Sequence, residues 1–314
     1  MFNKILVTGS TGFLGHHLMP RLREAFPSAE LIGLGRSDYN LLEPGEPAAM
    51  LKDIKPDCVI HMAAKSGGII TNKKRPADFF YENLTMNTHT LHESWKAGVK
   101  KFVTFMGGCS YPSNAASPIG EDQMWNGYPQ IESAGYSVAK KMLITQSWAY
   151  RVQHNFNSIV LIPGNVYGEW DNFNLEESHV IPALIRKYIE AQERGDKTIT
   201  AFGTGRPTRD FVYAGDVAAA VPWFIKNYDS SEPVNISAGR RISIRELAET
   251  VKKATGFAGE IVWDTTKPDG QMDKIFDVTR LNALGLSCNT TLEEGLCRTA
   301  QWFLKARGEG TVRL

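Results

Sequence analysis

A tyrosine and a lysine stand four residues apart in the stretch Tyr136-Ser137-Val138-Ala139-Lys140. On a helix this spacing places the two side chains on one face, one turn from each other. Because an ammonium beside a phenol favours the phenolate, we expect the pKa of Tyr136 to fall below the ~10 of a free phenol. Such a phenol can protonate a ketone oxygen while hydride reaches the carbon. The pattern is common, and an accidental pair on a surface helix is the alternative.

A cysteine and a serine follow the apolar run at residues 101–106, in the stretch Gly107-Gly108-Cys109-Ser110-Tyr111-Pro112. Ligands of parallel α/β folds bind beyond the carboxyl ends of the strands. We therefore expect Cys109 and Ser110 near any site that Tyr136 serves. A free cysteine is usually a small buried apolar group, and that alternative stays open.

His179 stands where a helix is predicted to begin. Ser178 can cap this helix, Pro182 lies in its first turn, where proline is tolerated, and Gly195 can end it. The positive end of the helix dipole disfavours a protonated imidazole, so we expect His179 to stay neutral and able to accept a proton. A surface histidine at a helix start is the alternative.

The elements that must position these groups begin near the N-terminus. A short apolar strand at residues 5–8 runs into Gly9-Ser10-Thr11-Gly12-Phe13-Leu14-Gly15 and then into an amphipathic helix. Gly9 permits a tight turn, Gly12 lets the backbone approach a pyrophosphate, and Gly15 lets the helix pack on the strand. The positive end of the helix would face the phosphates. This context predicts a dinucleotide site, and a glycine-rich loop without a ligand is the alternative.

The end of the second strand decides between the two nicotinamide cofactors. An acidic residue there binds the ribose hydroxyl of NAD, whereas an arginine pairs with the 2′-phosphate of NADP. Here the strand at residues 29–34 is followed by Gly35-Arg36-Ser37 and then Asp38. Arg36 and Ser37 favour NADP, while Asp38 leaves NAD as the less favoured choice.

Other strand exits offer room for a cofactor. The apolar run 57–64 ends in Ala63 and Ala64, which are small enough for a cofactor to lie close, and we expect His61 within it to be a core histidine. Asn83 lies among apolar residues of a predicted long helix, where a buried amide requires a specific hydrogen bond. The strand at 157–162 leaves through Pro163-Gly164-Asn165-Val166-Tyr167-Gly168.

Apolar runs that alternate with helical patterns predict an α/β fold: a doubly wound parallel-sheet Rossmann domain with a smaller C-terminal α/β substrate domain. We expect residues 1–165 and 208–238 to form the dinucleotide-binding domain, and residues 166–207 and 239–314 the substrate domain. In the second part the pattern predicts a loop over 202–211, a strand at 234–237, helices at 244–255 and from 291 onward, and a turn at Lys267-Pro268-Asp269-Gly270.

The bulk properties limit the class of protein. The chain has 314 residues, is 42% hydrophobic and 22% charged, and carries a formal net charge of +1, so neither nucleic acid nor a membrane is an expected partner. Four cysteines without paired spacing argue against a disulfide framework and a zinc site, and fit a reducing cytoplasm. We expect no signal peptide, no membrane span and no metal.

Together these features resemble the extended short-chain dehydrogenase/reductase family. Gly9-x-x-Gly12-x-x-Gly15, Tyr136-x-x-x-Lys140 and the exit after the strand at 157–162 occur in its order and spacing. Within that family the chain is similar to the GDP-L-fucose synthases, which act on GDP-4-keto-6-deoxymannose. The likeness covers essentially the whole chain, and more specific stretches carry it: Ala64-Lys65-Ser66-Gly67-Gly68-Ile69, Cys109-Ser110-Tyr111-Pro112, Asp171-Asn172-Phe173, Ser178-His179-Val180-Ile181-Pro182-Ala183-Leu184, Asp277-Val278-Thr279-Arg280-Leu281 and Gln301-Trp302-Phe303-Leu304.

The resemblance implies an NADP(H)-dependent 4-ketoreductase, with C3 and C5 epimerase activity, on a GDP-4-keto-deoxy sugar, paired as a homodimer through two long helices. It implies Cys109 and His179 as the acid–base pair of the epimerisation. It implies Tyr136 as proton donor to the ketone oxygen and Lys140 as the residue that holds the nicotinamide ribose. The cofactor ligands it implies are Gly9, Thr11, Gly12, Phe13, Leu14, Gly15, Arg36, Ala63, Ala64, Asn83, Lys140, Pro163, Asn165, Val166 and His179. The substrate ligands it implies are Ser110, Lys187, Phe202, Arg209 and Asp269.

The chain departs from the family pattern at several positions. Gly107 stands where the family has a serine or threonine hydroxyl that holds the substrate carbonyl oxygen, so Ser110, Cys109 or a water must stand in, or the reaction differs. Lys187 and Phe202 replace an arginine and a tryptophan, and Gln271-Met272-Asp273 replaces a more basic stretch. A related 4-keto sugar, such as a heptose or another deoxyhexose, is therefore an alternative substrate.

Two other functions stay open. The first is a different nucleotide-sugar epimerase that holds and recycles NAD. The second is a non-catalytic cofactor-binding member of the fold that has lost the hydroxyl at position 107. The joint presence of Tyr136, Lys140, Cys109 and His179 speaks against the second.

Overall fold

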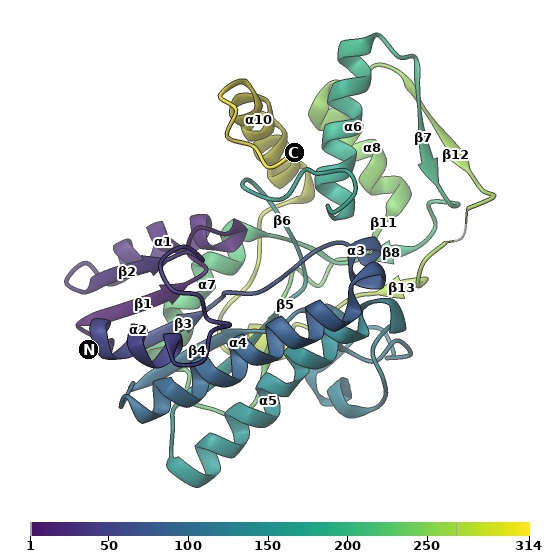
Figure 1. Ribbon diagram of the computed structural model, residues 1–314. Helices are drawn as coiled ribbons and strands as arrows, with labels where there is room; N and C mark the ends of the chain where they lie inside the picture. The colour runs from purple at the N-terminus through teal and green to yellow at the C-terminus, as the bar shows by residue number, and fades with distance from the viewer. Residues whose placement is uncertain (1, 268) are drawn as a thin grey trace.

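A computed structural model describes residues 2–267 and 269–314 of the chain. Its centre is a six-stranded sheet in which every neighbouring pair runs parallel, in the order β10-β5-β4-β3-β1-β2 (Figure 1). The predicted doubly wound parallel sheet is confirmed. The strands are β1 (Lys4–Thr8), β2 (Glu30–Leu34), β3 (Cys58–His61), β4 (Lys101–Phe105), β5 (Ser158–Pro163) and β10 (Val234–Ile236).

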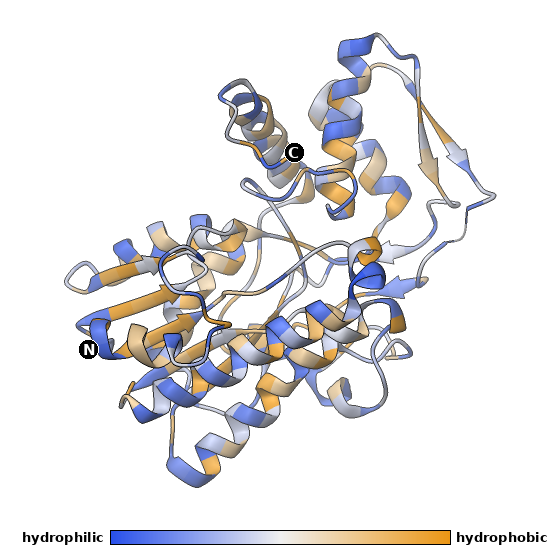
Figure 2. Cartoon of the chain, in the orientation of Figure 1, coloured by the Kyte–Doolittle hydropathy of each residue, from blue (hydrophilic) through white to orange (hydrophobic). Residues whose placement is uncertain are grey.

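Helices cover both faces of this sheet (Figure 1). On one face α1 (Phe13–Ala25) and α7 (Ala214–Asn227) pack together, and on the other lie α2 (Glu46–Ile54), α4 (Pro76–Lys96) and α5 (Ala134–His154). Successive residues of β1 point to opposite faces: Ile5 and Val7 join the core under α1 and α7, and Leu6 joins the core under α2 and α4. Figure 2 shows these apolar strands between helices that carry both polar and apolar stretches.

A second core lies above the carboxyl ends of the strands, in the upper part of Figure 1. A capping box, which the sequence analysis did not identify, begins the last helix: the Thr291 hydroxyl accepts from the Glu294 amide while the Glu294 carboxylate accepts from the Thr291 amide. The elements of this part are α6 (Val180–Arg194), α8 (Ile244–Thr255), α10 (Leu292–Gly308), β6 (Asn165–Tyr167), β7 (Thr198–Phe202), β8 (Thr208–Arg209), β9 (Phe211–Tyr213), β11 (Ile242–Ser243), β12 (Glu260–Asp264) and β13 (Asp273–Lys274). The short helix α9 (Thr279–Ala283) instead lies beside β10, and its Leu281 packs into the core under α1 and α7.

The strand β9 joins the two cores. Phe211 and Tyr213 pack into the second core, whereas Val212 between them packs into the core under α1 and α7. This alternation, together with the parallel pairing of β9 with β6, keeps the upper elements over the edge where the central strands end.

Several predicted boundaries are corrected. The run 57–64 forms a strand only at β3, and the loop predicted over 202–211 contains β8 and begins β9. Ser178 does not cap the helix after it: His179 is the N-cap of α6, and the Ser178 hydroxyl is buried without a partner among the described residues. The predicted turn at 267–270 includes Pro268, which lies outside the described residues. Elements that the pattern did not reveal include α2, α3 (Ile69–Lys74), α9 and the single turns η1 (Gly108–Ser110), η2 (Glu121–Trp125) and η3 (Ile131–Ser133).

Neither a membrane span nor a metal cluster is found in the described part of the chain. None of its helices is both long and apolar enough to cross a membrane. Across residues 2–267 and 269–314, histidine, cysteine and carboxylate side chains form no group of three that could hold a metal ion.

The substitution Gly15→Ala tests the packing of α1 on the loop before it. A Cβ at Gly15 would lie 2.2 Å from the carbonyl oxygen of Ser10 and 2.7 Å from that of Gly9, and backbone atoms cannot yield cheaply. We expect urea denaturation to show a loss of about 2–3 kcal/mol. Gly308→Ala, at a helical glycine with no neighbour within 4 Å, is the control and should change stability by less than about 1 kcal/mol. Equal effects of the two changes would contradict this account.

Candidate active site

The glycine-rich loop after β1 has the shape expected of a phosphate cradle. Gly9 has φ +75°, and a Cβ there would lie 2.7 Å from the amide nitrogen of Ala63, so the loop touches the exit of β3 directly. Gly12 is the N-cap of α1, and only the Gly9 carbonyl lies near the position of its missing Cβ. The N-terminus of α1 therefore opens beside backbone that side chains do not cover. Thr11 is exposed at the tip of this loop, and Phe13 and Leu14 are half-buried in the first turn of α1.

The end of β2 lies against the same loop. The amide of Gly35 donates to Oδ2 of Asp38 at 2.7 Å, so this carboxylate is occupied by the local turn. Gly35 is close to Thr11, because a Cβ there would lie 2.9 Å from the Thr11 hydroxyl. Arg36 is exposed next to this contact. The arginine, rather than the aspartate, is the charged group here that is available to a ligand.

A buried amide shapes the exit of β3. Asn83 donates to the carbonyl oxygen of Lys65 at 3.0 Å and accepts from the Lys65 amide at 3.1 Å. Its remaining donor hydrogen goes to the carbonyl of Phe79. The side chain of Asn83 thus holds the loop that carries Ala63, which is half-buried, and Ala64, which is exposed, instead of facing a ligand itself.

His61 is a core histidine, as predicted. It is fully buried, with Nδ1 2.9 Å from the Thr8 hydroxyl and Nε2 3.2 Å from Oδ1 of Asn87. Burial, followed by the nearby charge of Lys140, lowers the pKa of His61 to about 3. The ring is therefore neutral and ties β1, β3 and α4 together below the site.

The exit of β5 faces the substrate side. Pro163 ends the strand in the core, and Asn165 begins β6, where its amide donates to the carbonyl oxygen of Asp210 at 2.8 Å. Val166 packs against the core under α1 and α7. These residues fix the backbone path at the edge of the sheet.

Tyr136 and Lys140 lie one turn apart on α5, as their spacing predicts. The predicted lowering of the Tyr136 pKa is wrong for the protein by itself: loss of solvent raises it, and the charge of Cys109 raises it further. Desolvation is also the main effect on Lys140, whose pKa falls to about 8 against the opposing influence of Cys109. Tyr136 consequently stays protonated at neutral pH, which is the state that a proton donor requires.

Cys109, Gly107 and Tyr136 border one point. A Cβ at Gly107 would lie 3.2 Å from Sγ of Cys109, 3.4 Å from Cε1 of Tyr136 and 3.6 Å from the Tyr136 hydroxyl. The position where the hydroxyl is missing is thus beside the proton donor. Ser110, by contrast, is fully buried, and its hydroxyl is unpartnered among the described residues.

Lys274 is a site residue to which the sequence analysis gave no role. It lies on β13, opposite Arg209 of β8 in the pairing of the two strands. Burial lowers its pKa, the charge of Cys109 raises it and that of Arg209 lowers it, so its ammonium shares the surroundings of the reactive thiol. A strand of two residues has too little periodicity to be recognised in a sequence.

His179 is the N-cap residue of α6 and is exposed. Desolvation by the protein around it lowers its pKa, which is the direction expected for a neutral imidazole. Two residues earlier, the carbonyl of Glu177 accepts from the amide of Gly68 at 2.8 Å, which joins this segment to the loop after β3. Within the described residues, no hydrogen bond or charge contact joins His179 to Cys109 or Tyr136.

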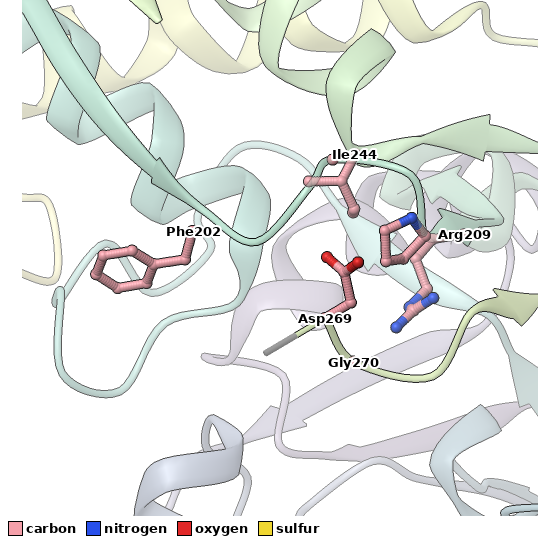
Figure 3. Close-up of a pocket in the computed structure, with 7 residues that line it drawn as sticks. Phe202, Arg209, Ile244, Asp269 and Gly270 are labelled. Atoms are coloured by element: carbon pink, nitrogen blue, oxygen red, sulfur yellow. The ribbon is translucent and has the colours of Figure 1, made fainter. Parts of the chain in front are cut away.

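A small pocket lies further out, lined by Phe202, Gly205, Pro207, Arg209, Ile244, Asp269 and Gly270 (Figure 3). Arg209 donates to the carbonyl oxygen of Gln271 at 2.6 Å, and its guanidinium lies beside Gly270. The Asp269 carboxylate accepts from the amide and hydroxyl of Thr204, so it holds the loop. Lys187, from α6, has its ammonium 5.7 Å from the centre of the exposed Phe202 ring.

Comparison with known proteins shows the family to which the chain belongs. The sequence profile of the NAD dependent epimerase/dehydratase family matches residues 5–238, and the chain belongs to this family. It is similar to GDP-L-fucose synthase 1 of Arabidopsis thaliana, with 37% identity over 302 residues that cover 96% of this chain and 93% of that protein. It is 39% identical to GDP-L-fucose synthase of Sinorhizobium fredii, covering 96% of this chain and 95% of that one.

Solved structures agree with this class. A GDP-L-fucose synthetase from Naegleria fowleri, bound to NADP, matches with a TM-score of 0.92 and 32% identity, covering 99% of this chain and 95% of that chain. A GDP-6-OMe-4-keto-L-xylo-heptose reductase from C. jejuni matches with a TM-score of 0.89 and 28% identity, covering 96% of this chain and 98% of that chain.

The substitution Lys140→Met tests the buried ammonium. At low pH Lys140 of the folded protein is charged in a desolvated site, which lowers the stability of the fold. Above its folded pKa of about 8 the Lys140 amine is neutral in the folded protein, whereas the same lysine in the unfolded chain still binds its proton, so this cost is progressively relieved as the pH rises. Wild-type stability relative to K140M should therefore rise by roughly 2 kcal/mol between about pH 6.5 and about pH 9.5 in urea denaturation. The exposed Lys52→Met controls for loss of a surface lysine. If the difference in free energy of unfolding between wild type and K140M does not change with pH, Lys140 does not lie in a desolvated site.

Proposed function

We propose that the protein is an NADP(H)-dependent 4-ketoreductase that also epimerises C3 and C5 of a GDP-4-keto-deoxy sugar. The observation that carries the proposal is the shared border of Tyr136, Cys109 and Gly107, beyond the ends of the parallel strands. The similarity to GDP-L-fucose synthases and to a heptose 4-keto reductase supports this choice of substrate class. In this proposal residues 1–165 and 208–238 bind the dinucleotide, and residues 166–207 and 239–314 bind the nucleotide sugar.

The residues present fit the cofactor. Gly9 and Gly15 occupy positions where a Cβ would collide with backbone, which leaves the bare loop and helix N-terminus that a pyrophosphate requires. NADPH, when bound, supplies the hydride for C4. Arg36 would pair with the 2′-phosphate, and Lys140 would donate to the nicotinamide ribose.

The chain's own residues move the protons. Tyr136, protonated at neutral pH, gives its proton to the C4 oxygen and regains one from solvent. A 4-keto group makes the hydrogens on C3 and C5 acidic, so inversion needs a base on one face of the ring and an acid on the other. In this proposal Cys109 and His179 take these parts.

The nucleotide part of the substrate lies toward the outer pocket. Arg209 and Lys187 supply positive charge for the diphosphate, and the exposed Phe202 ring offers a face on which a base can stack. Asp269 contributes by fixing the loop at Thr204. A direct part for Ser110 in substrate binding would require η1 to move, since its hydroxyl is buried.

The protein acts, in this proposal, as a homodimer in the cytoplasm. Its four cysteines are free, which suits a reducing compartment. The long helices α4 and α5 pack side by side and expose large apolar side chains, as an interface requires: Phe80, Tyr81, Trp148 and Val152. A sedimentation coefficient of a monomer at micromolar concentration would contradict the pairing.

The function is tested with NADPH and GDP-4-keto-6-deoxymannose in deuterated water. We expect NADPH to be consumed and deuterium to appear at C3 and C5 of the product, because reduction and carbon deprotonation both occur. Tyr136→Phe should slow hydride transfer by roughly 10²–10⁴-fold while binding of NADPH persists. Consumption of NADPH without deuterium at C3 and C5 of the product would indicate a 4-ketoreductase that does not epimerise. The absence of turnover with every member of a panel of 4-keto sugar nucleotides would contradict the proposal that the protein is such an enzyme.

Arg36→Ala tests the choice of cofactor. Loss of the charge-assisted contact with the 2′-phosphate should raise the KM for NADPH at least about tenfold and leave kcat/KM with NADH within about threefold. Arg23→Ala, an exposed arginine at the other end of α1, is the matched control and should change neither constant. An equal loss with both cofactors would show that Arg36 does not read the phosphate.

A further inference from the structure

The backbone conformation at position 107 does not require a glycine. Its φ of −91° and ψ of 145° are ordinary extended values. The next residue differs, because a Cβ at Gly108 would lie 2.3 Å from the ring of Phe276. Around Gly107 the nearest atoms belong to the side chains of Cys109 and Tyr136, at 3.2–3.6 Å. The missing side chain therefore leaves a space of about one methyl group between the thiol and the phenol.

This space lies beside the position that the reduced oxygen must take. An oxygen that receives a proton from Tyr136 has to come within about 3 Å of its hydroxyl. Negative charge develops on that oxygen as hydride arrives, and a second donor beside Tyr136 stabilises it. Residue 107 has no side chain, and the hydroxyl of Ser110 is buried. Sγ of Cys109, 3.2 Å from the position of the missing Cβ, is a side-chain donor that borders this point.

We propose that the thiol of Cys109 donates the second hydrogen bond to the carbonyl oxygen during hydride transfer, in the place that a side chain at position 107 would otherwise fill. The inference rests on the proposed 4-ketoreductase function. It gives Cys109 a part in reduction that is separate from its part as acid or base in epimerisation. Thiols are weak donors, so the contribution is smaller than that of a hydroxyl.

The two parts of Cys109 fit one order of events. When Cys109 acts as the base, its thiolate takes a proton from carbon and becomes S–H, while His179, after taking a proton from solvent, gives that proton to the same carbon from the opposite face. That carbon is then inverted; the thiol releases its proton to solvent before the second carbon reacts in the same way, and the cysteine is protonated once both carbons are inverted. S–H is the form that can donate to the carbonyl oxygen, so deprotonation of carbon prepares the site for reduction.

The test measures hydride transfer without epimerisation, as single-turnover oxidation of GDP-L-fucose by NADP⁺ followed by NADPH absorbance. Cys109→Ala should slow this step at least about tenfold, because the donor is lost. Cys109→Ser should be at least about tenfold faster than C109A, since its hydroxyl can donate. The double variant Gly107→Ser/Cys109→Ala should recover at least about tenfold over C109A, because a hydroxyl at position 107 reaches the same space. Cys297→Ala, on the exposed face of α10, is the matched control and should match the wild type.

Two further measurements keep the outcomes distinct. The dissociation constant of NADP⁺ and the thermal midpoint of each variant should equal those of the wild type, which excludes a loss of fold. A C109A protein with wild-type hydride transfer, or a double variant no faster than C109A, would overturn the inference. A wild-type protein that transfers no hydride in either direction would instead contradict the proposed function.

Discussion

The close approach of two strand exits is the constraint on which the rest of the site depends. The loop after β1 lies so near the exit of β3 that no side chain fits at Gly9, whose Cβ would stand 2.7 Å from the Ala63 amide. Below this contact the neutral ring of His61 bridges Thr8 and Asn87. Because the strands are parallel, every exit lies on the same edge of the sheet, and the groups that α5 and η1 bring to this edge share one cleft.

Desolvation sets the protonation states inside that cleft. It raises the pKa of Tyr136 and lowers that of Lys140 to about 8, and in both cases the influence of Cys109 is the smaller effect. Both groups are thereby poised toward their neutral forms, phenol and amine. Burial, rather than the direct pairing that the spacing of Tyr136 and Lys140 suggests, is therefore the main influence on the pKa values of these two groups.

Motifs with long or periodic patterns were predicted from the sequence, whereas side-chain surroundings were not. The parallel sheet, the glycine loop, the helix of Tyr136 and the helix that begins near Thr291 follow from spacing and local propensity. The direction of the Tyr136 pKa, the burial of Ser110 and the place of Lys274 depend on contacts between distant segments, which a sequence does not display. Short strands such as β8 and β13 escape recognition for the same reason, since their pairing partners stabilise them.

The fate of a labelled hydride tests the central claim most directly. NADPH that carries deuterium at its transferable position is incubated with GDP-4-keto-6-deoxymannose in ordinary water, and the product sugar is examined by NMR. A 4-ketoreductase built as described places the deuterium on C4, bonded to the carbon whose oxygen received the proton of Tyr136. A product labelled at any other carbon, or an unlabelled product, would contradict this account of the site.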